Sequence, residues 1–214
     1  MSGRVLCAGC LRPQRNCICA LAQRVDCAAE LLILQHPLEV HEAKGTARLL
    51  HLCLPRSRME VGEQFDAPQL QAWLEQAWQG DAPAPAPAPV PRTVLLYPES
   101  PHDAALPLRP APPLPAEWLD APERLRLVVI DGTWRKSRKM LYLNPLLQQL
   151  PRLALQDLPA SRYAIRRAHR PGQLSTLEAT SCALAQLQPG LDVRPLLVAM
   201  DALVQRQQQW RSPG

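Results

Sequence analysis

The sequence predicts an α/β fold in which helices flank a mostly parallel sheet. Short apolar runs of the kind that form buried strands alternate along the chain with longer patterns of helical period. One of these runs, residues 128–130, ends abruptly in Asp131 and Gly132, and a helical pattern begins soon afterwards. Alternating strands and helices usually build a parallel sheet, and ligands bind outside the carboxyl ends of its strands. We therefore expect Asp131 to be a catalytic or binding carboxylate.

The individual elements follow from hydrophobic periodicity and turn residues. Extended segments are expected at residues 28–35, 59–61, 93–97, 125–130, 153–155 and 163–165. Helices are expected at residues 43–52, 69–79, 136–150, 176–187 and 194–209. Residues 82–91 alternate small apolar residues with Pro, which is typical of a polyproline II spacer. Because strand and helix patterns continue on both sides, we expect this tract to be an insert within one domain, residues 28–214.

The positive charge of the chain is concentrated in one segment. The formal net charge is +5, but residues 135–170 hold nine Lys and Arg against one acid and net +8, so the rest nets −3. A basic segment on a mildly acidic protein is typical of a polyanion partner, and the alternative is a solvated basic face without a partner. Four of the cations crowd the first turn of an expected helix, where the helix dipole disfavours them unless an anion is held there. They are Arg135, Lys136, Arg138 and Lys139.

Four of the seven cysteines fall within thirteen residues near the start of the sequence, as two close pairs. Cys7 and Cys10 form a Cys-x-x-Cys turn, and Cys17 and Cys19 follow shortly after it. Because Zn²⁺ prefers four tetrahedral thiolate ligands, we expect a structural zinc knuckle in residues 1–27. A redox pair or free buried thiols are the alternatives.

Composition also indicates where the protein works. An odd number of cysteines suits a reducing compartment better than a disulfide framework. The sequence has no apolar run long enough to span a membrane and no apolar signal-peptide core at its start. We therefore expect a cytoplasmic protein with no membrane association and no evident obligate protein partner.

The motifs of the chain occur in an order that resembles a known family. They are Cys-x-x-Cys with Cys-x-Cys, His36-Pro37-x-Glu39, Leu95-Leu96-Tyr97-Pro98, Asp131-Gly132-Thr133-Trp134, Tyr163-x-Ile165-Arg166 and Leu174-Ser175-Thr176-Leu177-Glu178-Ala179. From about residue 5 to about residue 200, the chain resembles the DTW-domain family of tRNA-uridine aminocarboxypropyltransferases. The family takes its name from the Asp-x-Thr-Trp element.

This resemblance implies a fold, a donor and a reaction. The fold is related to the SPOUT class of RNA-modifying enzymes, which can carry a trefoil knot near the cofactor. The donor is S-adenosylmethionine, whose sulfonium gives its 3-amino-3-carboxypropyl arm to N3 of a tRNA uridine and leaves methylthioadenosine. The sequence is compatible with this donor, because it lacks the Gly-x-Gly-x-x-Gly of a Rossmann-type dinucleotide site.

The resemblance also suggests catalytic roles, each with a structural alternative. Asp131 is the candidate general base for the N3 proton, or the group that orients the uracil; otherwise it caps the following turn. Thr133 is expected to bond to cofactor or base, or to be the N-cap of the next helix. Trp134 is expected to stack on a base, or to belong to the core.

Further residues are expected to bind the donor, the RNA or the substrate. The candidate donor contacts are Leu96, Tyr97, Pro98, Asp131, Gly132, Arg166, Leu174, Ser175, Thr176 and Glu178. Ser175 and Glu178 also have the spacing of a helix-capping box. Arg135, Lys136, Arg138, Lys139, Arg167 and Arg170 are the candidate RNA contacts. His36 and Glu39 follow the first expected strand, as part of a substrate loop or of a turn held by Pro37.

Two other functions stay open on the sequence alone. A SPOUT-type RNA methyltransferase would share the donor and the fold but release S-adenosylhomocysteine. A non-catalytic zinc-knuckle RNA-binding module would explain the cysteines and the basic segment, but not the buried strand that ends in Asp131.

Overall fold

The computed structural model describes residues 5–78, 90–99, 103–156 and 174–209. The chain divides into two compact units. We call residues 28–37 and 58–154 the sheet unit, and residues 1–27, 38–57 and 155–214 the helical unit. The extended segment expected at 163–165 and most of the Ala-Pro tract lie outside the described residues.

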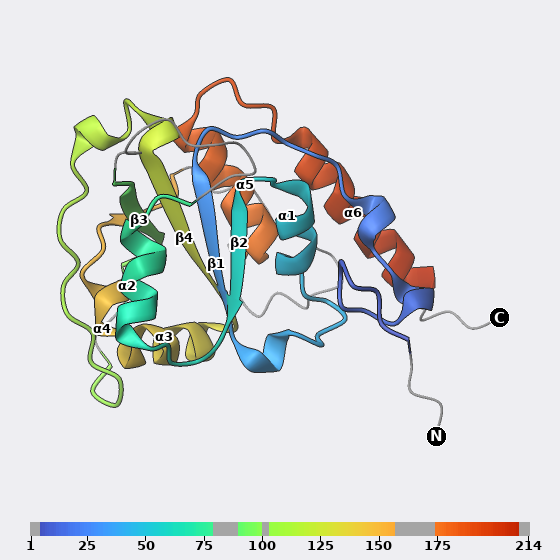
Figure 1. The fold of residues 1–214 in the computed structure, drawn as a ribbon, viewed down its shortest axis with the longest axis horizontal. Coiled ribbons are helices and arrows are strands. Elements are labelled where there is room, and N and C mark those ends of the chain that lie inside the picture. The colour runs from blue at the N-terminus through green and yellow to red at the C-terminus, as the bar shows by residue number, and fades with distance from the viewer. Residues whose placement is uncertain (1–4, 79–89, 100–102, 157–173, 210–214) are drawn as a thin grey trace. The chain divides into compact units, whose positions relative to one another are not determined.

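The sheet unit is built on five strands in the order β2-β1-β4-β3-β5 (Figure 1). The strands are β1 Glu30–Gln35, β2 Ser57–Val61, β3 Arg92–Leu96, β4 Leu125–Asp131 and β5 Arg152–Leu153. β4 pairs in parallel with β1 and β3, and β3 pairs in parallel with β5. This arrangement confirms the predicted α/β fold with its parallel sheet; the knotted topology stays a prediction.

Apolar side chains explain why β1 and β4 occupy the middle of the sheet. Residues 31–34 of β1 are fully buried, as are Leu127 and Val128 of β4. Parallel strands covered on both faces read as continuous apolar runs, which is what these two segments show. Thr93 sits at the buried start of β3, where its hydroxyl donates to the carbonyl of Leu74 at 2.5 Å.

Among its described residues the sheet unit has three α-helices, and the single helix predicted over residues 136–150 was wrong. They are α2 Ala67–Glu75, α3 Trp134–Leu143 and α4 Pro145–Gln148. A single helix was expected over residues 136–150, but Asn144 and Pro145 divide it. Pro145 has no N–H and excludes Asn144 from helical geometry. The Asn144 side chain instead donates to the carbonyls of Met140 and Glu63.

The helical unit contains α1 Ala47–Cys53, α5 Thr176–Leu187 and α6 Arg194–Gln209, which contact one another. α5 and α6 have the bounds that the hydrophobic period predicted. α1 starts four residues later than expected, because Gly45 continues a turn, with its N–H bonded to the carbonyl of Glu42 at 2.9 Å. Within the described parts of the chain, no helix combines the length and the hydrophobicity needed to cross a membrane.

Candidate functional site

The carboxyl ends of β1 and β4 form the topological switch point of the sheet. The connection that follows β1 leads to β2 at one edge, whereas the connection that follows β4 leads past β3 to β5 at the other edge. Adjacent strands whose connections leave in opposite directions create the place where open α/β sheets bind ligands. Asp131 pairs in register with Gln35 at this point, so the residues after both strands meet there.

Asp131 is held in place by the end of β1. Its side chain is 6% exposed, and its Oδ2 accepts a hydrogen bond of 2.8 Å from the Nε2 of Gln35. Its backbone carbonyl accepts a further bond of 2.9 Å from the N–H of His36. Sequence reasoning missed Gln35, because a glutamine that closes an apolar run carries no distinctive signal.

A second group of ionisable side chains lies beside the switch point. The His36 Nε2 is 3.0 Å from one oxygen of Glu63, and the other oxygen of Glu63 is 2.9 Å from the Nζ of Lys139. The bonds to Lys139 and His36 lower the pKa of Glu63. Glu63 was not among the predicted residues, although it follows Gly62 just beyond the carboxyl end of β2, where the sheet rule places functional side chains.

Close packing at the β4–α3 junction explains why residue 132 is glycine. A Cβ added to Gly132 would lie 3.2 Å from the Cβ of Lys136 and 3.6 Å from that of His36. Thr133 is the N-cap of α3, and its hydroxyl accepts the N–H of Lys136 at 3.4 Å. The capping alternative for Thr133 is therefore present in the structure.

Trp134 is not a core residue. Its side chain is 54% exposed, and its ring stands edge-on to the ring of Tyr97, with 5.9 Å between the centroids. Tyr97 itself is buried, with its hydroxyl 3.4 Å from the Ser137 hydroxyl. An exposed indole beside the switch point has the placement that stacking on a base requires.

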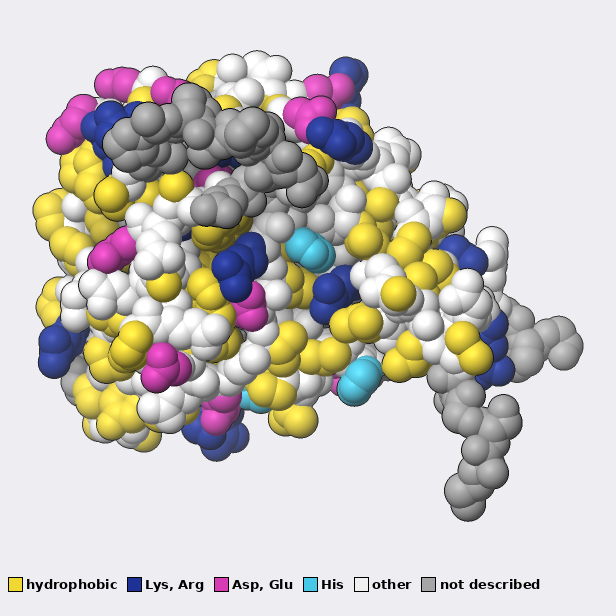
Figure 2. Space-filling model, viewed as in Figure 1, with side chains coloured by type: hydrophobic (Ala, Val, Ile, Leu, Met, Phe, Trp, Pro, Cys, Tyr) yellow, Lys and Arg dark blue, Asp and Glu magenta, His cyan; other side chains and the backbone are white. Residues whose placement is uncertain are grey.

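The basic residues of α3 differ in whether they bond to other residues of the protein. Arg138 donates to the carbonyl of Leu106 and lies 3.4 Å from a carboxylate oxygen of Asp103. Lys139 is paired with Glu63, whereas Arg135 is exposed. In the view of Figure 2, Lys and Arg side chains are scattered among hydrophobic and neutral ones. Arg167 and Arg170 lie outside the described residues, as does Arg166.

A cavity of about 480 Å³ opens at the carboxyl ends of β3 and β5. Tyr97, Arg138 and Arg152 line it, together with Glu99 and the Pro-rich segment 108–114. Leu96 is half-buried at the end of β3, and the carbonyl of Pro98 accepts a 3.3 Å bond from Arg152. The volume falls within the range of about 300–1,000 Å³ that is usual for small-molecule sites. Arg152 was missing from the predicted set.

In the helical unit, the segment around Ser175 forms a complete capping box. The Ser175 hydroxyl accepts the N–H of Glu178 at 3.2 Å, and the Glu178 carboxylate accepts the N–H of Ser175 at 2.8 Å. The hydroxyl of Thr46 accepts the N–H of Leu177 at 3.2 Å. These three amide groups are bonded within the unit, so the capping-box alternative for Ser175 and Glu178 is present in the structure. Leu174 directly precedes the box and Thr176 lies within it, and both residues are half-buried.

Glu39 belongs to the helical unit. It ends the short 3₁₀ helix Pro37–Glu39 and is 6% exposed, so it is not a surface carboxylate. Its backbone carbonyl accepts the N–H of Glu42 at 3.1 Å and so starts the turn that precedes α1.

The four N-terminal cysteines converge in the helical unit. The sulfur atoms of Cys7, Cys10, Cys17 and Cys19 all lie within 4.8 Å of one another. The shorter separations are 3.4 Å, 3.6 Å and 3.8 Å. A regular tetrahedron with Zn–S bonds of about 2.3 Å has edges of about 3.8 Å, so the cluster fits Zn²⁺.

The local backbone and electrostatics also suit a cation. Leu11 adopts φ 57°, which closes the turn after Cys10, and its N–H bonds to the carbonyl of Cys7. A backbone hydrogen bond from Cys10 is the main cause that lowers the pKa of Cys7 to about 6, whereas burial raises that of Cys19 to about 12. Four thiolates this close repel one another, so joint ionisation needs a positive charge at their centre.

Comparison with known proteins gives the family. The model of the DTW domain matches residues 4–208, nearly the whole chain. The chain belongs to the DTW-domain family. No solved structure matches this DTW-domain chain.

Curated relatives of this DTW-domain chain share one printed name, tRNA-uridine aminocarboxypropyltransferase. The Macaca fascicularis protein numbered 2 is 28% identical over 190 residues, which cover 85% of this chain and 56% of the relative. The Drosophila melanogaster protein numbered 2 is 31% identical, covering 90% of this chain and 70% of the relative. The Arabidopsis thaliana protein A is 25% identical over 98% of this chain. The chain thus spans little more than half the length of the first of these relatives.

Proposed function

We propose that this protein transfers the 3-amino-3-carboxypropyl group of S-adenosylmethionine to N3 of a uridine in tRNA. The observation that carries the proposal is Asp131, a buried carboxylate fixed by Gln35 at the switch point of the sheet. It stands in the element after which the DTW domain is named. The shared name of the curated relatives supports the reaction class.

The proposed reaction needs a single base. Asp131 takes the proton from N3 of the uracil, and the N3 electron pair attacks the γ-carbon of the donor's amino-acid arm. The C–S bond breaks, and its electrons return to sulfur, which turns the sulfonium into the neutral thioether of methylthioadenosine. Gln35 keeps the Asp131 side chain in one orientation while that carboxylate takes up the proton, since an amide N–H can donate to either protonation state.

The donor is proposed to bind at the carboxyl ends of β3 and β4. Leu96, Tyr97, Pro98 and Gly132 are the residues assigned to that contact in the sheet unit. Trp134 is assigned to stack on a base, because its ring is exposed. For Ser175, Thr176, Glu178 and Arg166, donor contact remains a prediction from the family resemblance.

The four clustered cysteines are proposed to hold one Zn²⁺ in a structural role. When bound, the ion neutralises and cross-links the thiolates of a segment too small to form its own core. None of the seven cysteines is in a disulfide bond, and we propose that the protein acts in a reducing compartment, the cytoplasm.

The by-product separates the proposed reaction from methyl transfer. Purified protein is incubated with S-adenosylmethionine and total tRNA, and the small molecules are resolved by chromatography. Methylthioadenosine formed only when tRNA is present supports aminocarboxypropyl transfer. S-adenosylhomocysteine would show a methyltransferase, and an unconsumed donor with bound tRNA would show a binding module.

A further inference from the structure

Arg152 is an arginine with one unbonded edge, and it lines the cavity at the carboxyl ends of β3 and β5. Arg152 begins β5 and pairs in register with Leu95. Its Nη1 donates to the carbonyl of Pro98 at 3.3 Å, and its guanidinium stacks 5.5 Å from the centroid of the Tyr97 ring. These two contacts fix the plane of the guanidinium in the wall of the cavity.

The remaining edge of that guanidinium lacks partners. The Nε and Nη2 of Arg152 are buried, and neither has a hydrogen-bond partner. Among the described residues, no carboxylate lies within ion-pair distance of Arg152, although Glu99 lines the same cavity. A buried donor without a partner is costly, and a charged one more so, which is why such groups usually mark a ligand.

Geometry and charge together indicate what would occupy this edge. Nε and Nη2 form one fork of parallel N–H donors, which matches two oxygens of a carboxylate or phosphate. Burial is the main cause that lowers the pKa of Arg152, and the guanidinium of Arg138 also lowers it, whereas Tyr97 and Glu99 act in the opposite direction. An anion would relieve this repulsion. Arg138, Arg109 and Arg152 give the lining three cations against the single carboxylate of Glu99.

We propose that the Arg152 edge is an oxyanion-binding site that receives a carboxylate or phosphate group in the cavity. Arg152 is bonded to the carbonyl of Pro98, two residues after the end of β3. Because β3 separates β5 from β4, the site lies roughly two strand spacings, about 10 Å, from the end of β4. Under the proposed function, the oxyanion is the carboxylate of the donor's amino-acid arm or a tRNA phosphate. The site itself does not depend on which of these is correct.

Arg92 provides a matched control for substitutions of Arg152. It lies on β3 and donates to the carbonyl of Glu117 at 3.2 Å, with its guanidinium 5.9 Å from the Trp118 ring. It therefore makes the same two kinds of structural contact, but it is not part of the cavity lining. Arg152→Gln removes the charge and the fork, whereas Arg152→Lys keeps the charge and removes only the fork.

The first measurement is independent of the proposed function. Thermal melts of the full chain are recorded in sodium phosphate, sodium acetate and sodium chloride at equal ionic strength. For the wild type and Arg92→Gln, we expect a higher Tm in phosphate or acetate than in chloride. For Arg152→Gln and Arg152→Lys, we expect the Tm to be the same in all three salts. Equal anion effects in Arg152→Gln and Arg92→Gln would overturn the proposal.

The second measurement identifies the source of the oxyanion by equilibrium binding. If it is the donor carboxylate, Arg152→Gln should bind S-adenosylmethionine about 10- to 100-fold more weakly and methylthioadenosine, which lacks the carboxylate, unchanged. If it is a tRNA phosphate, only tRNA binding should weaken. If the wild type binds these ligands and Arg152→Gln binds each of them as tightly as Arg92→Gln does, the proposed site is contradicted. A wild type that responds to phosphate but binds neither donor nor tRNA would retain the site and remove the proposed function.

Discussion

At the residue scale, the proposed reaction depends on a carboxylate that is buried and held in one orientation. Asp131 is the last residue of β4, two positions before the N-cap of α3, so the strand fixes its backbone and Gln35 fixes its side chain. Such positioning reduces the reorganisation needed when a proton moves. Gln35 and Asp131 are 96 residues apart in the chain and meet only because β1 and β4 are neighbours.

Asp131→Asn tests the general base. Asparagine keeps the shape and the hydrogen-bonding oxygen but is a far weaker base, so we expect normal folding and normal tRNA and donor binding. Single-turnover rates should fall about 10²–10⁴-fold, and the loss should shrink as pH rises and the uracil loses its proton without help. A lower Tm with unchanged turnover per folded molecule would instead assign Asp131 a structural role. Full activity at normal stability would remove it from the mechanism.

Glu63 gives a pH-dependent prediction at the same scale. Its pKa is lowered in the folded protein by Lys139 and His36, so its ionised form stabilises the fold. That contribution is present above the unfolded pKa, about 4.3, and is lost as pH falls through the lower folded value. The Tm of wild type should therefore exceed that of Glu63→Gln near neutral pH, and the gap should close in acid. A gap that is constant from neutral to acid pH would contradict the ion pairs.

At the element scale, the sequence predicted β1, β3, β4, α5 and α6 well, because their apolar periods are strong. It placed Asp131 at the end of a strand because the apolar run stops there, and β4 does end at Asp131. It did not predict Glu63 or Arg152, since their partners depend on which strands are adjacent. Asn144 and Pro145 indicate the division between α3 and α4 in the sequence. It was not predicted because the apolar residues on both sides of it follow one helical period.

The four-cysteine cluster connects to α5 through elements of the helical unit. Arg12, between the cysteine pairs, donates to the carbonyl of Gly45 at 3.1 Å, and the adjacent Thr46 accepts the N–H of Leu177 in the first turn of α5. Loss of the metal should loosen this chain of contacts, because the knuckle has little core of its own.

Cys17→Ser tests both the metal site and this connection. Metal analysis should give about one zinc per wild-type chain and much less for the variant. Cys182→Ser, which removes a thiol outside the cluster, should keep its zinc. Amide hydrogen exchange at Leu177 should be faster in Cys17→Ser than in wild type. Equal zinc contents in all three proteins would contradict the site.

At the scale of the whole molecule, the family motifs are shared between the two units. The sheet unit carries Asp131, Trp134 and Tyr97, and the helical unit carries the cysteine cluster and the Ser175 capping box. The concentration of positive charge between residues 135 and 170 predicted an RNA partner, but it did not show that Arg138 and Lys139 already have acidic partners. Arg135 is therefore the clearest candidate for phosphate contact on α3.

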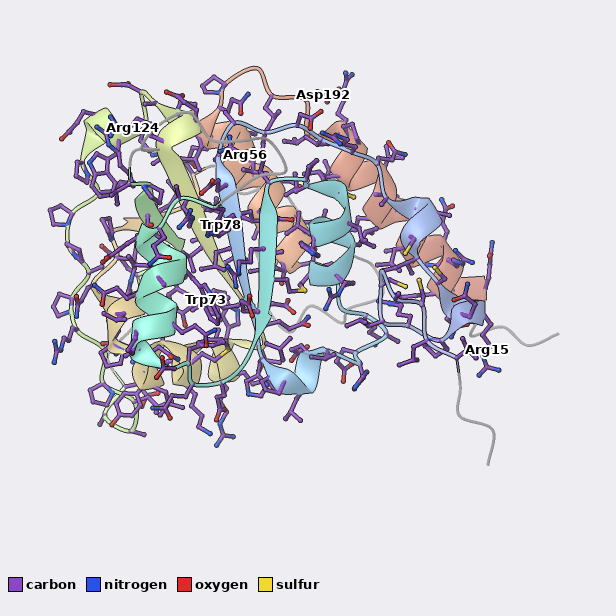
Figure 3. All side chains as sticks on the ribbon, in the orientation of Figure 1. Arg15, Arg56, Trp73, Trp78, Arg124 and Asp192 are labelled. Carbon is purple, nitrogen blue, oxygen red and sulfur yellow. The ribbon has the colours of Figure 1, made fainter. Side chains whose placement is uncertain are left out.

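The charge prediction has a matched pair of variants. Arg135 follows the carboxyl end of β4, whereas the exposed Arg124 precedes its amino end, opposite α3 (Figure 3). Arg135→Gln should weaken tRNA binding and lower the slope of log K against log salt by roughly 0.7–0.9, the effect of one lost phosphate contact. Arg124→Gln removes the same charge and should leave the slope unchanged. Equal slopes for both variants would mean that Arg135 faces solvent in the complex.

The most direct test of the central claim is mass spectrometry of the tRNA nucleosides. Unmodified tRNA is incubated with the full chain and S-adenosylmethionine, digested to nucleosides and compared with a reaction that contains Asp131→Asn. We expect a uridine that has gained the aminocarboxypropyl group on N3 in the wild-type reaction, and little or none with the variant. A methylated uridine, or tRNA that stays unmodified although the protein binds it, would contradict the proposed function.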